Sequence, residues 1–122
     1  MATLSDNVFD SGLNYITSNA DEIHICSQEP ADYTEATSTY SLGNGSTTAG
    51  AAQDRTGGGR EVVIAAVSTG SVTGTGTATH YAVVDSVSSE LLATGDLSSS
   101  VSVTSGNNFT LTAISVGIPD PA

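Results

Sequence analysis

The sequence has very little positive charge. Its 122 residues contain two arginines and no lysine against thirteen aspartates and glutamates, which gives a formal net charge of −11. Two arginines cannot release many counterions from a phosphate backbone, so the composition argues against binding to nucleic acid. It argues equally against an anionic membrane surface. We therefore expect neither nucleic acid nor a membrane among the partners of this protein.

Cysteine and long apolar runs are also scarce. Cys26 is the single cysteine, which excludes an internal disulfide and fits a reducing compartment. No stretch approaches the ~20 apolar residues of a membrane span. The N-terminus has neither a basic region nor an apolar run, and we expect no signal peptide.

Side chains that carry chemistry are few. His24 and His80 are the only imidazoles, and no cysteine or histidine has the spacing of a zinc site. The glycine runs are not phosphate cradles, because a Walker loop needs a lysine. A Ser–His–Asp set from His80 and Asp85 is better explained by coincidence, since serines are so numerous. We expect no enzymatic activity, no metal and no cofactor.

Large apolar side chains are also few. There is no tryptophan, and two phenylalanines and four tyrosines stand among many Ala, Val, Ser, Thr and Gly residues. A buried large side chain contributes about 1.5–3 kcal/mol, whereas each ordered residue costs about 1–2 kcal/mol of backbone entropy. We expect a modestly stable monomer that gains stability by forming an oligomer or by docking onto a larger body.

Hydrophobic periodicity indicates the regular structure. Residues 3–19 carry apolar residues at helical spacing, with Thr3 as a candidate cap, and predict one helix. We expect this helix to pack on the core, and an arm that docks on a neighbouring chain is the alternative. Period-2 alternation over most of the remaining chain predicts antiparallel strands with Ser/Gly turns. The expected strands cover residues 22–26, 60–68, 71–85, 90–97, 101–103 and 109–118, with hairpin turns at 86–89 and 104–108.

These elements predict a single domain over residues 1–122. Its fold class is mainly β, an antiparallel β-sandwich or barrel with a short N-terminal helix. Residues 3–19 form the helix, residues 20–59 a strand plus a long loop, and residues 60–118 the body of the sandwich. A loop as long as 27–59 is normally functional or ordered by a partner. Tyr33 and Tyr40, its two aromatic residues, are therefore the expected anchors on a neighbouring chain.

Both cations lie in one short segment, DRTGGGR, at residues 54–60. Arg60 opens a strand and is expected to be structural, paired with a carboxylate of its own chain. Arg55 precedes three glycines, Gly57, Gly58 and Gly59, which leave its position loosely defined. A loop tip suits a partner contact, so Arg55 and the three glycines are predicted to bind a neighbouring subunit or a larger assembly.

The C-terminal half resembles a group of small all-β virion proteins of tailed bacteriophages. Residues 78–97, ATHYAVVDSVSSELLATGDL, follow the group's pattern of Thr-His-x-x-hydrophobic-hydrophobic-Asp, a short turn and Leu-Leu-Ala-x-Gly-x-Leu. Residues 103–118 supply its Val-x-x-Gly-Asn turn and last apolar strand. Asp85 is the hairpin aspartate and has a structural role by this resemblance. Val84 stands where many members have an aromatic residue.

Fainter similarities in residues 23–43 and at Arg60 extend the resemblance over about residues 20–118. It implies a head-decoration (cement) protein or a small part of a tail or fibre. The thin core, the long loop and the acidic body favour the capsid surface. The expected partners are further copies of the chain, as a trimer, and the major capsid protein. The expected location is the virion, after assembly in the host bacterial cytoplasm. A tail or fibre component is the chief alternative, and a carbohydrate-binding β-sandwich ranks below it because exposed aromatics are few.

Overall fold

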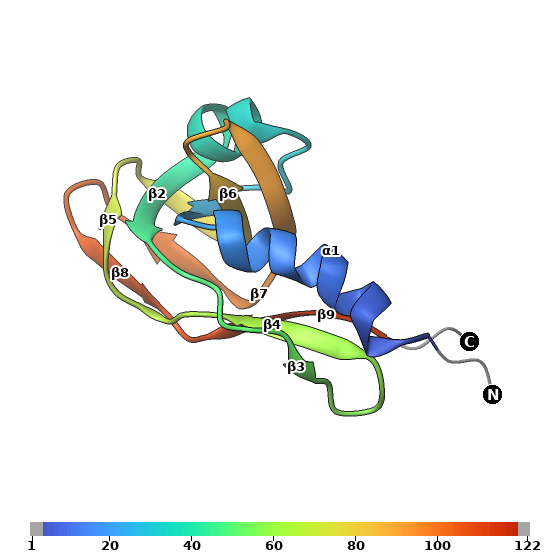
Figure 1. Cartoon of the computed structure of the whole chain (residues 1–122). Helices are drawn as coiled ribbons and strands as arrows, with labels where there is room; N and C mark the ends of the chain where they lie inside the picture. Colours follow the sequence, from blue (N-terminus) through green and yellow to red (C-terminus); the bar gives the residue numbers. More distant parts are fainter. Residues whose placement is uncertain (1–3, 120–122) are drawn as a thin grey trace.

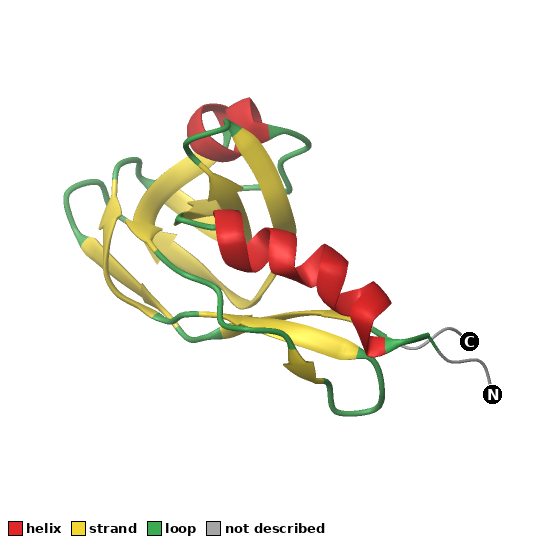
Figure 2. Cartoon of the chain, in the orientation of Figure 1, coloured by secondary structure: helices red, strands yellow, loops and turns green. Residues whose placement is uncertain are grey.

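One helix and two antiparallel sheets make up the fold in the computed structural model, which describes residues 4–119 (Figures 1 and 2). The sheets curve into a half-barrel with the helix across it, so the predicted mainly-β class with an N-terminal helix is confirmed. The elements are α1 (Asp6–Asn19), β1 (Glu22–Cys26), the π-helical turn η1 (Glu35–Thr39), β2 (Ser41–Ser46), β3 (Gln53–Asp54), β4 (Arg60–Ile64), β5 (Val67–Val72), β6 (Gly76–Asp85), β7 (Glu90–Val103), β8 (Asn108–Leu111) and β9 (Ile114–Ile118).

The two sheets share one long bent ribbon. The larger sheet has the order β7-β6-β1-β2-β5-β8, and the smaller has the order β3-β4-β9. Strands β4 and β5 follow each other along the chain, as do β8 and β9. Arg60 pairs with Ile118, Ile64 with Ile114 and Val67 with Leu111, so the two stretches run antiparallel past one another through both sheets. The ribbon therefore joins the sheets into one body.

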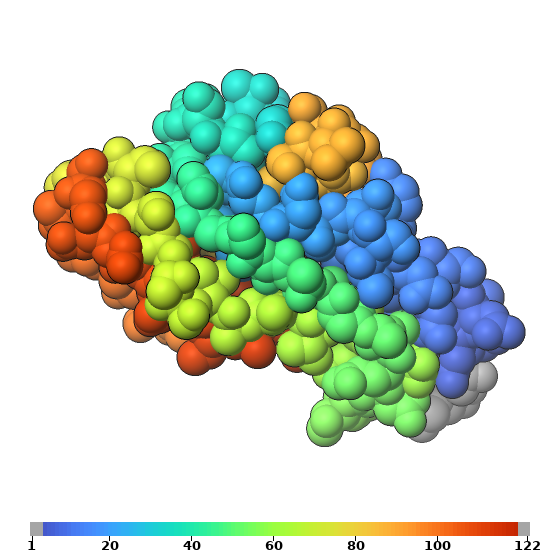
Figure 3. All heavy atoms as spheres, turned by 60° about the vertical axis from the view of Figure 1, so that its left-hand side comes forward, coloured from blue at the N-terminus to red at the C-terminus, as the bar shows by residue number. Residues whose placement is uncertain are grey.

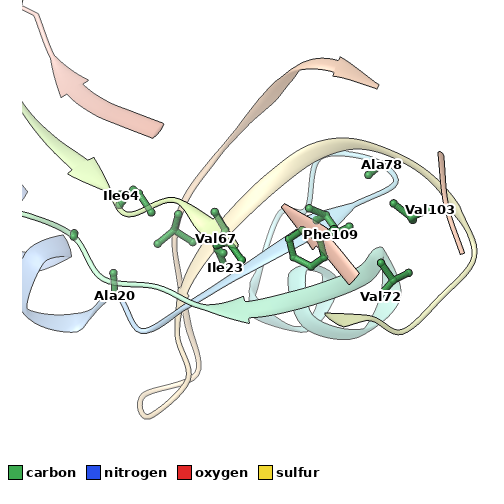
Figure 4. Packing of buried hydrophobic residues seen from close by; sticks show 11 residues of the cluster. Ala20, Ile23, Ile64, Val67, Val72, Ala78, Val103 and Phe109 are labelled. Atoms are coloured by element: carbon green, nitrogen blue, oxygen red, sulfur yellow. The ribbon is translucent and has the colours of Figure 1, made fainter. Parts of the chain in front are cut away.

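The main core lies inside the half-barrel (Figure 4). Strand β1 illustrates the pattern, because Ile23 and Ile25 point into this core and alternate with residues of the outer face. The Phe109 ring lies against Gly70, where a Cβ atom would come within 2.4 Å of it. The core consists of Ala20, Ile23, Ile25, Ala49, Ile64, Val67, Val72, Ala78, Val83, Val103 and Phe109.

The cap of helix α1 lies two residues later in the sequence than expected. The cap is Ser5, whose Oγ accepts a hydrogen bond from the backbone N–H of Asn7 at 3.2 Å. Thr3, the expected cap, lies outside the described residues. Phe9 and Leu13 are buried beneath the helix, as the apolar stripe predicts, and Val8 and Tyr15 are exposed on its other side.

The prediction of an uninterrupted loop over residues 27–59 is wrong. The segment contains η1, β2 and β3, and β2 is an interior strand between β1 and β5. The glycines of SLGNGS looked like turn residues, but Gly43 allows close approach of the neighbouring strand. A Cβ at Gly43 would lie 2.5 Å from the backbone oxygen of Ser71. The protein's own sheet therefore supplies the hydrogen bonds that a partner was expected to supply.

Several predicted strands have different limits or partners. Residues 60–68 and 71–85 are divided into β4, β5 and β6. The hairpin of 101–103 with 109–118 is also wrong. Residues 101–103 are the end of β7 and pair with β6, whereas β8 pairs with β5 and β9 with β4. These ladders join residues far apart in the sequence, which local periodicity does not specify.

A second, smaller core lies on the outer face of the larger sheet. It is covered by η1, which lies beside the β6–β7 hairpin in the space-filling view (Figure 3). The Cys26 thiol contacts the Ala36 carbonyl, with 3.6 Å between Sγ and the oxygen. The buried members are Cys26, Ala36, Ala82 and Val84, with Tyr33, Tyr40 and Leu91 packed at the margin.

Burial raises the pKa of the Cys26 thiol to about 11. At pH 8 only about a thousandth of such a thiol is the reactive thiolate, and the side chain has no exposed surface. We expect Ellman's reagent to leave the native protein unlabelled and to label it fully in denaturant. Rapid labelling of the native protein would mean that η1 opens readily.

Candidate partner-binding site

Arg60 is held by carboxylates from two other elements. Its Nε donates to Oδ1 of Asp10 in α1 at 3.0 Å, and its Nη1 donates to Oδ1 of Asp54 in β3 at 2.7 Å. A third carboxylate, that of Asp6, lies 4.0 Å away. The hydrogen bonds to Asp10 and Asp54 raise the pKa of the guanidinium further above its ordinary value. Arg60 thus ties the helix and the β3 edge to β4.

Arg55 lies folded back on its own turn. Its Nη1 donates to the carbonyl of Gly58 at 3.0 Å, and its Cδ packs over Gly117 of β9. The side chain is half-buried, and among residues 4–119 no carboxylate forms an ion pair with it. The structure therefore gives Arg55 a defined position in the monomer, in contrast to the mobile loop tip that the sequence suggested.

The three glycines form the tight turn between β3 and β4. Gly57, Gly58 and Gly59 all have positive φ, at 93°, 106° and 87°. A Cβ at Gly59 would lie 2.0 Å from the Ile118 carbonyl oxygen. The backbone that approaches this glycine closely is therefore the protein's own strand β9. Gly57 is exposed at the tip, while Gly58 and Gly59 are half-buried.

We expect Arg60→Met to lower Tm by several degrees and Arg55→Met to lower it much less. Methionine keeps part of the apolar stem but leaves Asp6, Asp10 and Asp54 close together without their cation. Added salt should reduce the loss in Arg60→Met, because the remaining carboxylates repel one another less when screened. Thermal melts at low and high salt measure both effects. Equal losses in the two variants would contradict this assignment.

Tyr33 and Tyr40 are half-buried in the second core rather than displayed for a partner. Both pack against the cluster of Cys26, Ala36 and Val84. The segment that carries them is fixed locally, since Ser27 N–H donates to the Tyr40 carbonyl at 3.0 Å. The rings retain exposed edges, but replacing them would also weaken the cover of this core.

Asp85 is buried and organises the β6–β7 turn. Its Oδ1 accepts from the backbone N–H groups of Val87 at 2.9 Å and Ser88 at 3.2 Å. Next to it, the carboxylate of Asp21 accepts from the Ser86 hydroxyl and from the Ser86 N–H. The two aspartates hold the hairpin turn against the start of β1, so Asp85 occupies a structural position.

The hydroxyl of Ser86 lowers the pKa of Asp21, and burial opposes this shift only in part. A carboxyl whose folded pKa is lowered stabilises the fold above its unfolded value and loses that contribution as pH falls through the folded value. The ordinary value is 3.8. We expect Ser86→Ala to be less stable than wild type above about pH 5, with the difference shrinking below about pH 3. Urea unfolding across this range measures it, and a difference independent of pH would contradict it.

The two histidines belong to separate hydrogen-bonded groups. Buried His24 contacts Glu22 Oε1 through Nε2 at 2.6 Å and Ser41 Oγ through Nδ1 at 2.9 Å. His80 contacts Asp96 Oδ1 through Nε2 at 2.8 Å. His80 and Asp85 do not form part of a Ser–His–Asp set, because the Asp85 carboxylate accepts hydrogen bonds from the β6–β7 turn. Sequence reasoning missed the Ser41–His24–Glu22 group because β2 was read as a loop. Ser41 lines none of the hollows described below.

The structure and the comparisons add three negative observations. Among residues 4–119, no three His, Cys, Asp or Glu side chains gather in a way that could hold a metal ion. Over the same range, no helix has both the length and the apolar character needed to cross a membrane. No family model, curated protein or solved structure matches this chain.

Proposed function

We propose that this protein is a structural component of a tailed-bacteriophage virion, and specifically a decoration protein that binds the outer surface of the head and stabilises it. It works as a homo-oligomer, a trimer, in contact with the major capsid protein. The resemblance of residues 78–97 supports this proposal. Those residues form the β6–β7 hairpin, in which Asp85 caps the turn and the Tyr81 ring lies over Gly95.

The main observation behind the proposal is that side chains able to act in catalysis or ligand binding are hydrogen-bonded within the fold. Arg60, Asp85, His24 and Cys26 are all engaged within the fold. The protein as a whole is acidic, with a formal net charge of −11, so a partner would recognise it by shape and charge. A protein of this kind acts through contact, as a cement protein does.

Cryo-electron microscopy of virions that carry this protein is the decisive experiment. We expect density for the half-barrel at many copies on the head, at local three-fold positions. Purified protein should also bind empty heads and raise the temperature at which they rupture. Light scattering of the free protein checks the trimer.

Other outcomes would assign the protein elsewhere. Density confined to the tail or a fibre would replace the proposal with a tail component. Specific retention on immobilised glycans, without head binding, would favour the carbohydrate-binding module. A stable monomer that leaves empty heads unbound would count against decoration altogether.

A further inference from the structure

Two strand edges remain without a neighbouring strand on the open side of the half-barrel. Within residues 4–119, β7 and β8 are the two outer strands of the larger sheet, and β9 is an outer strand of the smaller one. Because β9 continues directly from β8, residues 108–118 form one long edge along the bent ribbon. An outer strand presents a row of backbone N–H and C=O groups that can pair with another chain.

Three hollows follow the line between these edges, which we call the seam. The largest, of about 490 Å³, lies between residues 96–101 and 110–115. A second, of about 370 Å³, lies between residues 101–104 and 107–110. A small one of about 20 Å³ lies beneath them and reaches the core at Ile25 and Ala78. The seam is therefore hollowed along its length.

A bulge in β7 shapes one wall of the seam. Ala78 pairs with Val101 and His80 with Asp96, so the four residues 97–100 lie opposite Thr79 alone. Extra residues on one strand bend it and interrupt its ladder. Three of these four residues are serines, and two of them, Ser98 and Ser99, border the largest hollow together with Leu97.

The residues that line the hollows indicate which kind of ligand would fit the seam. Val101 is 47% exposed, and Leu97, Leu111 and Ile114 are half-buried along the same line, which suits alternate aliphatic side chains. Asp96 is the only charged residue that lines the hollows, and its side chain is 83% exposed. Its Oδ1 contacts His80 Nε2 at 2.8 Å, and the exposed remainder of the carboxylate suits a lysine or arginine on the ligand.

We propose that the seam binds one extended segment of a different protein by strand addition. The backbone of this segment pairs with the outer edges of β7 and β8–β9. Its aliphatic side chains alternate over Val101 and Leu111, and a basic residue lies near Asp96. Main-chain hydrogen bonds supply affinity and the side-chain positions supply specificity. The inference goes beyond the proposed function, because it concerns how a partner is held wherever the protein works.

Charge favours a foreign partner over a second copy of this chain. Each copy has a formal net charge of −11. Arg60 and Arg55, its only cations, are held by Asp10, Asp54 and Gly58 at the β3–β4 hairpin. A second copy could therefore offer Asp96 no free lysine or arginine, and opposite charges across an interface are what favour one partner over another. A basic, extended segment is attracted instead.

Three synthetic peptides test the seam. They share one alternating valine/threonine pattern and carry lysine, serine or glutamate at the same two positions. We expect the lysine peptide, added to ¹⁵N-labelled protein at up to about 1 mM, to shift the amide signals of residues 97–103 and 108–115. Binding should weaken as salt rises, and the glutamate peptide should bind about tenfold less tightly. The amides of β3, another outer strand, serve as the internal control and should not move.

Two variants sharpen the test. Asp96→Asn should weaken the lysine peptide about three- to fivefold, as expected for an exposed ion pair, and leave the serine peptide unchanged. Val101→Glu should weaken all three peptides. If no peptide shifts the seam amides, or if β3 responds equally, the proposal is overturned. Concentration-dependent dimerisation that protects the same amides from hydrogen exchange would assign the seam to a second copy and overturn the foreign partner.

Discussion

Replacing Phe109 with alanine should lower the free energy of unfolding by about 3–5 kcal/mol, the usual range for a buried phenylalanine. Phe109 is 7% exposed and lies in the centre of the labelled core (Figure 4). Its ring fills the space over Gly70, which has no side chain to close the resulting cavity. Domains of this kind have only about 5–15 kcal/mol in total, so the variant should be close to unfolding at room temperature.

Urea unfolding monitored by circular dichroism measures this loss through the denaturation midpoint. Val87→Ala is the matched control, because Val87 is 89% exposed and its truncation removes almost no buried contact. A midpoint for Phe109→Ala close to that of Val87→Ala would show that the ring is not the central packing element described here.

Gly43→Ala should also lower the free energy of unfolding substantially. The new Cβ would lie 2.5 Å from the Ser71 carbonyl oxygen and 3.1 Å from the Val72 Cα. These are backbone atoms of the paired strand β5, so β2 and β5 must separate to make room. Overpacking typically costs about 1–3 kcal/mol, and we expect the upper part of that range because no flexible side chain can yield. The same unfolding experiment provides the measurement.

Gly74→Ala is the control for this glycine. Its nearest neighbour would be a Leu42 side-chain carbon at 3.6 Å, an ordinary contact, and its φ is not in the positive region. The change should fall within about 0.5 kcal/mol of wild type. If the two alanine variants were equally stable, the close approach of β2 and β5 would be refuted.

Local patterns were sufficient to predict the elements whose side chains alternate cleanly. The stripe of Phe9 and Leu13 predicts α1, and the alternation around Ile23 and Ile25 predicts β1. The β6–β7 hairpin was predicted with its turn at 86–89, because apolar runs flank a Ser-rich segment. In each case, neighbouring residues carry the whole signal.

Strand β2 could not be predicted because its glycines are required by the strand that packs beside it in the sheet, not by residues nearby in the sequence. Gly43 and Gly45 are small where Ser71 and Val67 approach, and this requirement arises only after the sheet has formed. The partners of β8 and β9 were missed for a related reason. Pairing of Arg60 with Ile118 depends on the path of the whole chain between them.

For the candidate site residues too, the sequence predicted what depends on composition and missed what depends on contacts between distant segments. A carboxylate partner for Arg60 was expected from charge balance alone, but its identity was not. Asp10 comes from the helix, 50 residues earlier in the chain. Tyr33 and Tyr40 were expected to contact a partner because residues 27–59 were interpreted as a long loop that a partner would order. The surface that they cover is formed by Cys26 and Val84, from strands that meet only in the fold.

The bent ribbon that joins the two sheets also sets the order in which the protein can be completed. Among the elements of residues 4–119, β8 and β9 are synthesised last, yet β8 is the outer strand that pairs with β5 and β9 is the outer strand that pairs with β4. Until they arrive, the core side of β4 and β5 is uncovered and their free edges can pair with other nascent chains. Folding is therefore expected to be slow, as in other proteins dominated by distant strand pairings. A cell that makes many copies at once would be most exposed to aggregation during that interval, before the last eleven residues of the ribbon, 108–118, are in place.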